Sequence, residues 1–222
     1  MFVFVGFAKA QYVQLNRPDH DNMPYYFGIT LAYNSSYLAA TKNIKFVQDD
    51  SVFSVEPGAS GGISLGLLGT LKLNDFFEFR VNPQLVIGGA KYFTYHTNYP
   101  DKVEKKILPS TIVSFPFQLK FTSDRLNNFR TYLLSGVKFD MDLASNSAAR
   151  NAEDLVKLKK NDFALEAGIG FNFYLPFVTF SPEIKFSYGL TNIHARDPHL
   201  KYSNVFEKIQ SRMITFSIHL ED

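Results

Sequence analysis

The residues of this chain that could do chemistry are charged side chains that recur at every second position of otherwise apolar stretches. They are Glu78, Arg80, Lys120, Lys138, Asp140, Glu166, Glu183 and Lys185. Four are acids and four are bases, so they could pair with one another, or they could form a path for protons or ions. Because an unpaired buried charge is costly, the balance favours a structural network of ion pairs.

A second group of reactive side chains lies in one polar connection near the C-terminus and comprises His194, Asp197, His199 and Ser203. A nucleophile and a base could be assembled from such a set. The same residue types are common in solvated turns, and we expect no enzymatic activity. The histidines His20, His96, His194, His199 and His219 share no ligand spacing, and Cys is absent. We therefore predict neither a metal site nor a cofactor.

The elements that must position these charges are indicated most clearly by the stretch Asn161–Leu190. It consists of two runs in which apolar and polar residues alternate, separated by a break at Leu175-Pro176-Phe177. Alternation with period two is typical of β-strands with one apolar face, and two such runs around a tight break predict a hairpin. A tilted strand of about 9–11 residues spans a bilayer, whereas ordinary strands have about 5–6.

The same alternation recurs along the chain and predicts eight strands. Their ranges are Tyr25–Asn34, Ala59–Leu73, Phe77–Ile87, Thr111–Phe121, Phe129–Leu143, Asp162–Leu175, Val178–Leu190 and Met213–Leu220. Connections after the first, third, fifth and seventh strands are long, and the others are short turns. This pattern is typical of outer-membrane barrels and places both termini in the periplasm. Mid-strand prolines at Pro83, Pro116 and Pro182 could mark bulges or bends.

Two eight-stranded architectures compete, and they differ in which face points outward. A lipocalin-like barrel would place the apolar face inside, whereas a membrane barrel turns it toward lipid. An eight-stranded interior is just wide enough to be filled by side chains, so the many Phe residues of the apolar face are too bulky for it. We predict an all-β fold, an eight-stranded antiparallel up-and-down transmembrane β-barrel with a polar, filled lumen. Aromatic residues gather near both strand ends, as interfacial girdles would. Those at the short-turn ends are Phe76, Phe77, Phe129, Tyr132, Tyr174 and Phe177, and those at the long-loop ends are Tyr33, Tyr37, Tyr92, Phe93 and Tyr188.

Composition excludes other classes of protein. The mean hydropathy is −0.10, and no run of eighteen apolar residues exists, which argues against a helical membrane protein. The formal net charge is +2, and the basic residues form no stripe, so nucleic-acid binding has no support.

The chain divides into three expected segments. Residues 1–10 have the apolar run and the small-x-small ending, Ala8-Lys9-Ala10, of a truncated signal peptide, although a short buried strand is the alternative. Residues 11–24 are a polar periplasmic lead-in, and residues 25–222 form the outer-membrane barrel. The last strand should carry the insertion signal, but the usual terminal aromatic is missing and Glu221-Asp222 follow it.

Several motifs give the chain a resemblance to a known family. They include Tyr26–Leu31 (YFGITL), Leu126–Tyr132 (LNNFRTY), Asp142–Ser145 (DLAS) and Phe180–Phe186 (FSPEIKF). With them the sequence resembles the PorT family of outer-membrane β-barrel proteins of Bacteroidetes over about Pro24 to Leu220. The resemblance implies a role in the type IX secretion system and in gliding motility, as a component that assembles or supports the translocon. The family offers no catalytic residues to carry over.

Expected partners follow from this reading. They are outer-membrane lipids and lipopolysaccharide, the barrel-assembly machinery during insertion and, by resemblance, other type IX secretion components. Lysines at loop ends, Lys105-Lys106 and Lys157–Lys160, could contact lipopolysaccharide phosphates or could simply be solvated. The alternative function is a general small outer-membrane barrel, a structural anchor or adhesin that works through its loops.

Overall fold

The structure is a computed structural model that describes residues 14–42, 54–58, 60–88, 91–98, 101–108, 110–144, 158–194 and 206–222. Apart from one short 3-10 helix, η1 (Pro18–Asn22), its regular elements are strands. These are β1 (Tyr25–Lys42), β2 (Ser54–Gly58), β3 (Ser60–Lys72), β4 (Phe77–Val81), β5 (Gln84–Gly88), β6 (Lys91–Asn98), β7 (Asp101–Leu108), β8 (Thr111–Thr122), β9 (Phe129–Asp142), β10 (Asn161–Tyr174), β11 (Thr179–Gly189) and β12 (Phe206–Glu221).

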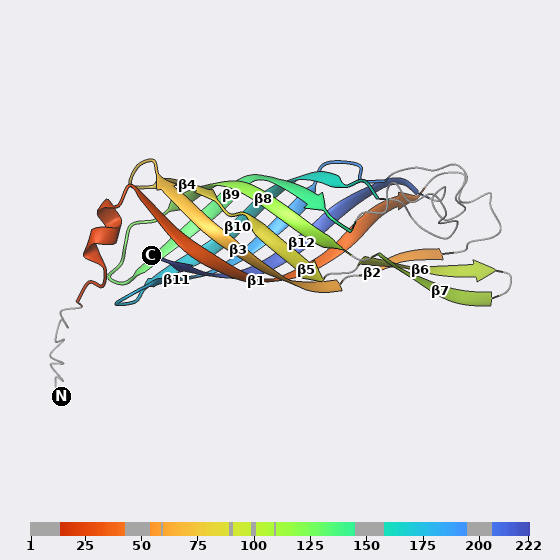
Figure 1. The fold of residues 1–222 in the computed structure, drawn as a ribbon, viewed down its shortest axis with the longest axis horizontal. Coiled ribbons are helices and arrows are strands. Elements are labelled where there is room, and N and C mark those ends of the chain that lie inside the picture. The colour runs from red at the N-terminus through yellow and green to blue at the C-terminus, as the bar shows by residue number, and fades with distance from the viewer. Residues whose placement is uncertain are drawn as a thin grey trace, which may run out of the picture.

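The large sheet closes on itself as a barrel (Figure 1). Its first strand, β1, pairs with β12 on one side and with β3 on the other, and the ring continues through β11, β10, β9 and β8. All of these pairs are antiparallel, and neighbours in the ring are joined by consecutive connections. Closure gives each strand position of the described ring a partner on both sides, as a lipid environment requires.

β4 and β5 together occupy one position of the ring. Both pair with β3 and with β8, and the chain between them leaves the ladder at Asn82-Pro83. Proline has no N–H to donate, but the Pro83 carbonyl still accepts from Leu67 N at 3.0 Å. Counting β4 and β5 as one strand, the ring has eight positions, which confirms the predicted eight-stranded up-and-down barrel.

The two faces of the barrel have opposite polarity. Phe, Leu, Ile and Val side chains point outward and are exposed; for example, Leu67 is 66% exposed and Phe163 56%. The alternate positions point inward and are mostly polar, and those on β10 and β11 are almost all buried. This arrangement excludes the lipocalin-like alternative, because water would have to solvate the whole apolar surface.

At the long-loop end the barrel departs from the predicted pattern. β1 and β12 each continue for about eight residues beyond the predicted ends, to Lys42 and from Phe206. In these extensions the polarity inverts, since Leu38 and Ile209 point inward and are buried whereas Lys208 is exposed. Inversion is expected where the barrel rises above lipid and water surrounds its outer face.

A second, three-stranded sheet extends from the same end in the order β2-β6-β7 (Figure 1). Two long connections were predicted there, so three strands were missed.

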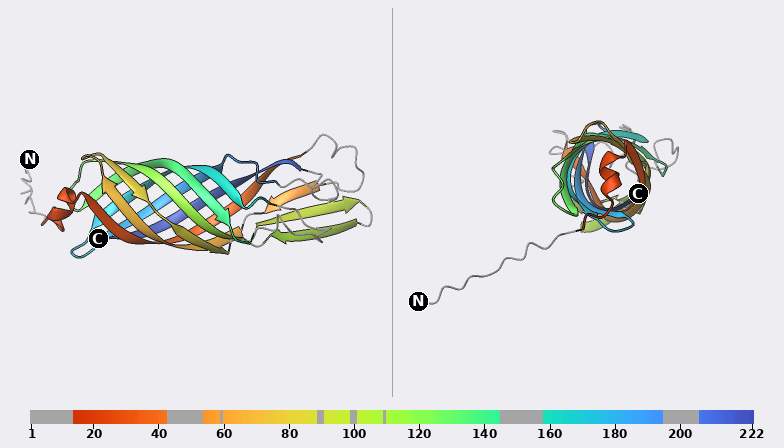
Figure 2. Two further views of the ribbon diagram at one scale, coloured as in Figure 1. Left: turned by 45° about the horizontal axis from the view of Figure 1, so that its top comes forward. Right: turned by 90° about the vertical axis from the view of Figure 1, so that its left-hand side faces the viewer.

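The opposite end, where the short turns lie, carries η1 and the C-terminus (Figure 2). Viewed along the barrel axis, η1 lies across the mouth of the barrel. The described part of the lead-in, residues 14–24, thus forms a cap at this mouth. Among the described residues, no helix is long and apolar enough to cross a membrane.

Candidate functional site

The centre of the lumen is organised by Arg80, which projects inward from β4 and is completely buried. Its Nη1 lies 2.8 Å from Glu183 Oε2 of β11, and its Nη2 lies 3.0 Å from Glu221 Oε1 of β12. A planar guanidinium can engage two acceptors at once, which a lysine ammonium does less rigidly. Arg80 therefore links β4 to the two strands on the far side of the ring.

The carboxylate of Glu183 has more charged and polar partners than the guanidinium of Arg80 has. Tyr132 OH donates to its Oε2 at 2.7 Å, and Lys185 Nζ lies 3.2 Å from its Oε1. The His219 Nε2 atom is 3.3 Å from the same Oε1. One carboxylate thus gathers side chains from β4, β9, β11 and β12, as a buried charge requires if its desolvation is to be compensated.

A neighbouring pair lies closer to the short turns. Lys120 Nζ is 3.1 Å from Glu78 Oε2, and Tyr26 OH donates to the same oxygen at 2.8 Å. Lys120 Nζ also stands 4.2 Å from the centroid of the Tyr132 ring. Tyr132 therefore receives Lys120 on its face while its hydroxyl binds Glu183, and it connects the two groups of charges.

A second charged cluster lies toward the long-loop end. Lys138 Nζ is 3.1 Å from Asp140 Oδ2 and 3.7 Å from Glu166 Oε1. Glu166 also accepts from Gln118 Nε2 at 2.8 Å and from Ser187 Oγ at 2.9 Å. A cavity of about 30 Å³ lies beside Lys138 and Asp140, room for about one water molecule.

All eight charged residues singled out in the sequence are buried in the lumen. The structure divides them between two clusters instead of joining them in one. The lower cluster contains Glu78, Arg80, Lys120, Glu183 and Lys185, and the upper one contains Lys138, Asp140 and Glu166.

Sequence reasoning missed four members of the lower cluster: Tyr26, Tyr132, His219 and Glu221. The predicted last strand ended at Leu220 and left Glu221 outside, although Glu221 continues the inward series Thr215, Ser217, His219. Extending that alternation by one residue would have found it. Tyr132 and Tyr174 were placed among the interfacial aromatics, which was wrong, because each is 2% exposed and points inward.

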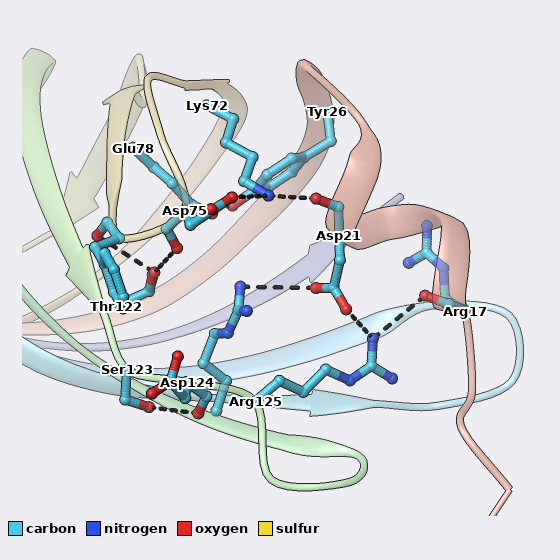
Figure 3. A network of polar contacts seen from close by, with 12 residues as sticks. Arg17, Asp21, Tyr26, Lys72, Asp75, Glu78, Thr122, Ser123, Asp124 and Arg125 are labelled. Atoms are coloured by element: carbon cyan, nitrogen blue, oxygen red, sulfur yellow. Dashed lines mark hydrogen bonds and ion pairs between the residues drawn. The ribbon is translucent and has the colours of Figure 1, made fainter.

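The mouth at the short-turn end is closed by the lead-in (Figure 3). Asp21 of η1 lies 2.9 Å from Arg125 Nη1 and 3.7 Å from Arg130 Nη1. Arg17 Nη1 donates to Thr179 Oγ1 at 3.1 Å and to the Glu221 carbonyl at 2.9 Å. The Lys72 ammonium binds the Asp21 carbonyl. The segment is thus tied to four parts of the rim.

His20 is the residue of η1 that enters the mouth. It is 5% exposed, and its ring stands 4.7 Å from the Tyr26 ring and 5.5 Å from the Tyr174 ring. Burial lowers the pKa of the imidazole below its ordinary value of 6.5, and the positive charge of Arg17 lowers it further. At neutral pH the cap therefore places an uncharged ring over the lumen.

The arrangement is suited to holding a barrel rigid and closed. Within the part of the chain that the structure describes, no group of three or more His, Asp or Glu side chains could hold a metal. Of the reactive set in the last connection, His194 is buried beside Ile193, whereas Asp197, His199 and Ser203 lie outside the described residues.

The sequence profile of a family described as "Outer membrane protein beta-barrel domain" matches residues 11–195. Among solved structures, the chain is similar to the outer membrane protein OprG from Pseudomonas aeruginosa, with 14% identity, a TM-score of 0.48, and coverage of 89% of this chain and 95% of that one. Neisserial surface protein A is 11% identical, with a TM-score of 0.46 and coverage of 87% of this chain and 96% of that one. Ail, the attachment invasion locus protein of Yersinia pestis, is 11% identical, with a TM-score of 0.41 and coverage of 90% of this chain and 100% of that one. No curated protein matches this chain.

Proposed function

Because this chain belongs to the outer membrane protein beta-barrel domain family, we propose that it is a non-enzymatic outer-membrane component of the type IX protein secretion system. The resemblance to the PorT family carries this proposal. In this role the barrel supports export of proteins across the outer membrane, and gliding motility where the host has it. Both termini lie in the periplasm, with the cap formed by residues 14–24 on that side.

Two of the motifs behind the resemblance supply contacts that close the barrel. In LNNFRTY, Asn128 accepts from the Asn16 backbone N–H at 2.8 Å, and Arg130 faces Asp21. In FSPEIKF, Glu183 and Lys185 belong to the lower lumen cluster. The shared residues thus support a common closed barrel rather than a common catalytic centre.

A closed lumen also indicates how the protein would support secretion. Side chains fill the interior and η1 covers one mouth, so a polypeptide has no route through the described barrel. We propose that it acts as a scaffold beside the export channel. Purified protein in planar bilayers should accordingly give no large steady conductance, and such a conductance would contradict the scaffold role.

The alternative, an adhesin-type barrel, is favoured by the sheet β2-β6-β7, which projects beyond the barrel at the long-loop end. Projecting strands are a suitable platform for surface contacts. In this case the sheet would bind and the barrel would only anchor it.

A gene deletion distinguishes the two functions. We expect the deletion strain to lose secreted proteins from the culture medium, and the full chain to restore them. A second complementing variant replaces Lys91–Leu108, the hairpin of β6 and β7, by a short Gly-Ser turn. That variant should restore secretion. Normal secretion in the deletion strain would contradict the secretion role. A loss of surface attachment with the hairpin variant would then support the adhesin function.

A further inference from the structure

The lipid-facing side of the barrel carries few charged side chains, and those few are basic. Among the described side chains of the barrel strands, the charged residues at outward positions are Lys208 and Arg212. Both are basic and both belong to β12. They lie near the long-loop end, where Ile209 already points inward and the polarity of the barrel has inverted. Basic residues on the lipid face are tolerated at the interface and destabilising in the middle of the bilayer.

The side chain of Arg212 is held in a fixed position. Its guanidinium carbon lies 3.4 Å from the centroid of the Tyr188 ring, and its Nη1 donates to the Ser211 carbonyl at 2.8 Å and to the Gly189 carbonyl at 3.3 Å. On the other side, β12 places Arg212 opposite Tyr37. No carboxylate of the described residues forms an ion pair with Arg212 or Lys208. The cation is therefore packed on the Tyr188 ring, with Tyr37 as its cross-strand neighbour and without an acidic partner in that part of the chain.

An apolar groove of about 620 Å³ lies on the same strands, closer to the middle of the barrel. Phe216 and Ile218 of β12, Leu31 and Tyr33 of β1, and Pro182 and Ile184 of β11 form much of its lining. On β12 it begins four residues from Arg212, about 13 Å along a strand. Its volume lies within the range of about 300–1,000 Å³ of small-molecule sites.

The groove has a cause in the sheet. Pairing between β10 and β11 runs to Gly170↔Glu183 and resumes at Phe173↔Phe180, so the ladder is interrupted beside Pro182. The outward residues Phe180, Pro182 and Ile184 are only partly exposed, so this part of β11 forms the floor of the groove. Phe216, 53% exposed, and Tyr33, 54% exposed, stand above this floor as the walls.

We propose that β1, β11 and β12 form a binding site for a phosphorylated lipid of the outer leaflet, of the lipid A class. Arg212 and Lys208 bind the phosphates, Tyr37 and Tyr188 frame the headgroup, and an acyl chain lies in the groove below. Arginine in a rigid fork is well suited to phosphate oxygens. The choice of lipid A rests on the proposed orientation, in which the long-loop end faces outward. It does not depend on the secretion role.

Binding to purified full-length protein in detergent tests this site, with native mass spectrometry as the readout. The probes are diphosphoryl lipid A, the same lipid without phosphates, phosphatidylglycerol, and inorganic phosphate. We expect R212Q to weaken binding of diphosphoryl lipid A by about 10-fold, since a charge-assisted hydrogen bond is lost. The control is K72Q, which removes a positive charge at the opposite, short-turn end of the barrel, and it should bind as the unmodified chain does.

The groove has its own pair of variants. I218W fills it, whereas L220W places the same ring at the next outward position of β12, where Leu220 does not line the groove. Only I218W should weaken lipid binding. Equal affinity of R212Q and the unmodified protein, equal binding of phosphatidylglycerol, or displacement of the lipid by inorganic phosphate would each overturn the proposal. Because the heat-shift on SDS gels reports folding, a variant that retains the shift is a valid test, and secretion does not enter the measurement.

Discussion

The lower lumen cluster depends on Arg80, because its guanidinium lies between the carboxylates of Glu183 and Glu221 and forms an ion pair with each. We predict that R80Q lowers the free energy of unfolding by about 3–5 kcal/mol, because removing one partner leaves buried charge uncompensated. Urea unfolding in detergent measures this change.

D75N is the matched control for R80Q. It breaks the ion pair between Lys72 and Asp75, whose side chain is 92% exposed, and should change the free energy of unfolding by less than about 1 kcal/mol. If R80Q were no less stable than D75N, the two carboxylates would have to find other partners or lose their charge.

His20 predicts a pH-dependent cap. Its pKa is lowered in the docked state, mainly by burial and then by Arg17, with Lys120 acting in the same direction and Glu221 and Glu78 acting against it. The free imidazole therefore binds a proton more readily than the docked one, so docking is fully stable above about pH 6.5 and weakens as the pH falls below it.

The absence of Cys allows a single label to report docking of the cap. N22C at an exposed position of η1 can carry a spin label, whose mobility should rise below pH 6.5. With H20F in the same chain the ring remains and the proton site is lost, so the mobility should become independent of pH. A label whose mobility does not change with pH in either chain would show that His20 does not control docking.

At the scale of elements, close packing of strands determines which glycines can be replaced. A Cβ at Gly136 of β9 would meet the Phe117 carbonyl oxygen and stand 2.8 Å from Gln118 Cα, both backbone atoms of β8. A Cβ at Gly69 of β3 would lie 3.7 Å from the Phe27 ring, an ordinary contact. We predict that G136A reduces the yield of folded barrel and that G69A does not, as measured by the fraction of outer-membrane protein that shifts on heating. Equal yields would mean that β8 and β9 can separate to admit a methyl group.

The elements also show how far the sequence could predict this structure. Strict alternation located every barrel strand, because lipid outside and a polar lumen inside impose opposite preferences on successive residues. The rule fails where that environment ends. Around Leu38 and Ile209 water replaces lipid, apolar residues turn inward, and the predicted strands stopped too early.

The lumen contacts were less predictable than the strands. Alternation identified which charges point inward, but pairing depends on how far opposite strands are staggered around the ring. Arg80 and Glu183 are 103 positions apart in sequence, and no local pattern relates them. The strands β2, β6 and β7 were missed because they form a separate sheet outside the ring, where the alternation of lipid-facing and lumen-facing residues is not imposed.

For the whole molecule, SDS gel electrophoresis with and without heating tests whether the ring of strands is closed. We predict that the protein, found in the outer-membrane fraction, runs compact on an SDS gel without boiling and shifts after heating, since inter-strand hydrogen bonds resist detergent when no edge is free. A chain without Phe206–Glu221 lacks the strand that pairs with both β1 and β11 and should show no shift. A soluble protein that migrates identically with and without heating would contradict the membrane barrel.

The contacts of the cap also fix an order of events during folding. Arg17 is made early in synthesis, yet its partners Thr179 and the Glu221 carbonyl belong to β11 and β12, which are made last. That binding site comes into existence only when β12 has paired with its neighbours. Contacts so distant in sequence form slowly, and here they must be the final step. The two Arg17 contacts of the cap can therefore form only on a completed barrel, and an incompletely assembled one holds η1 without them, by contacts such as those with Lys72, Arg125 and Arg130.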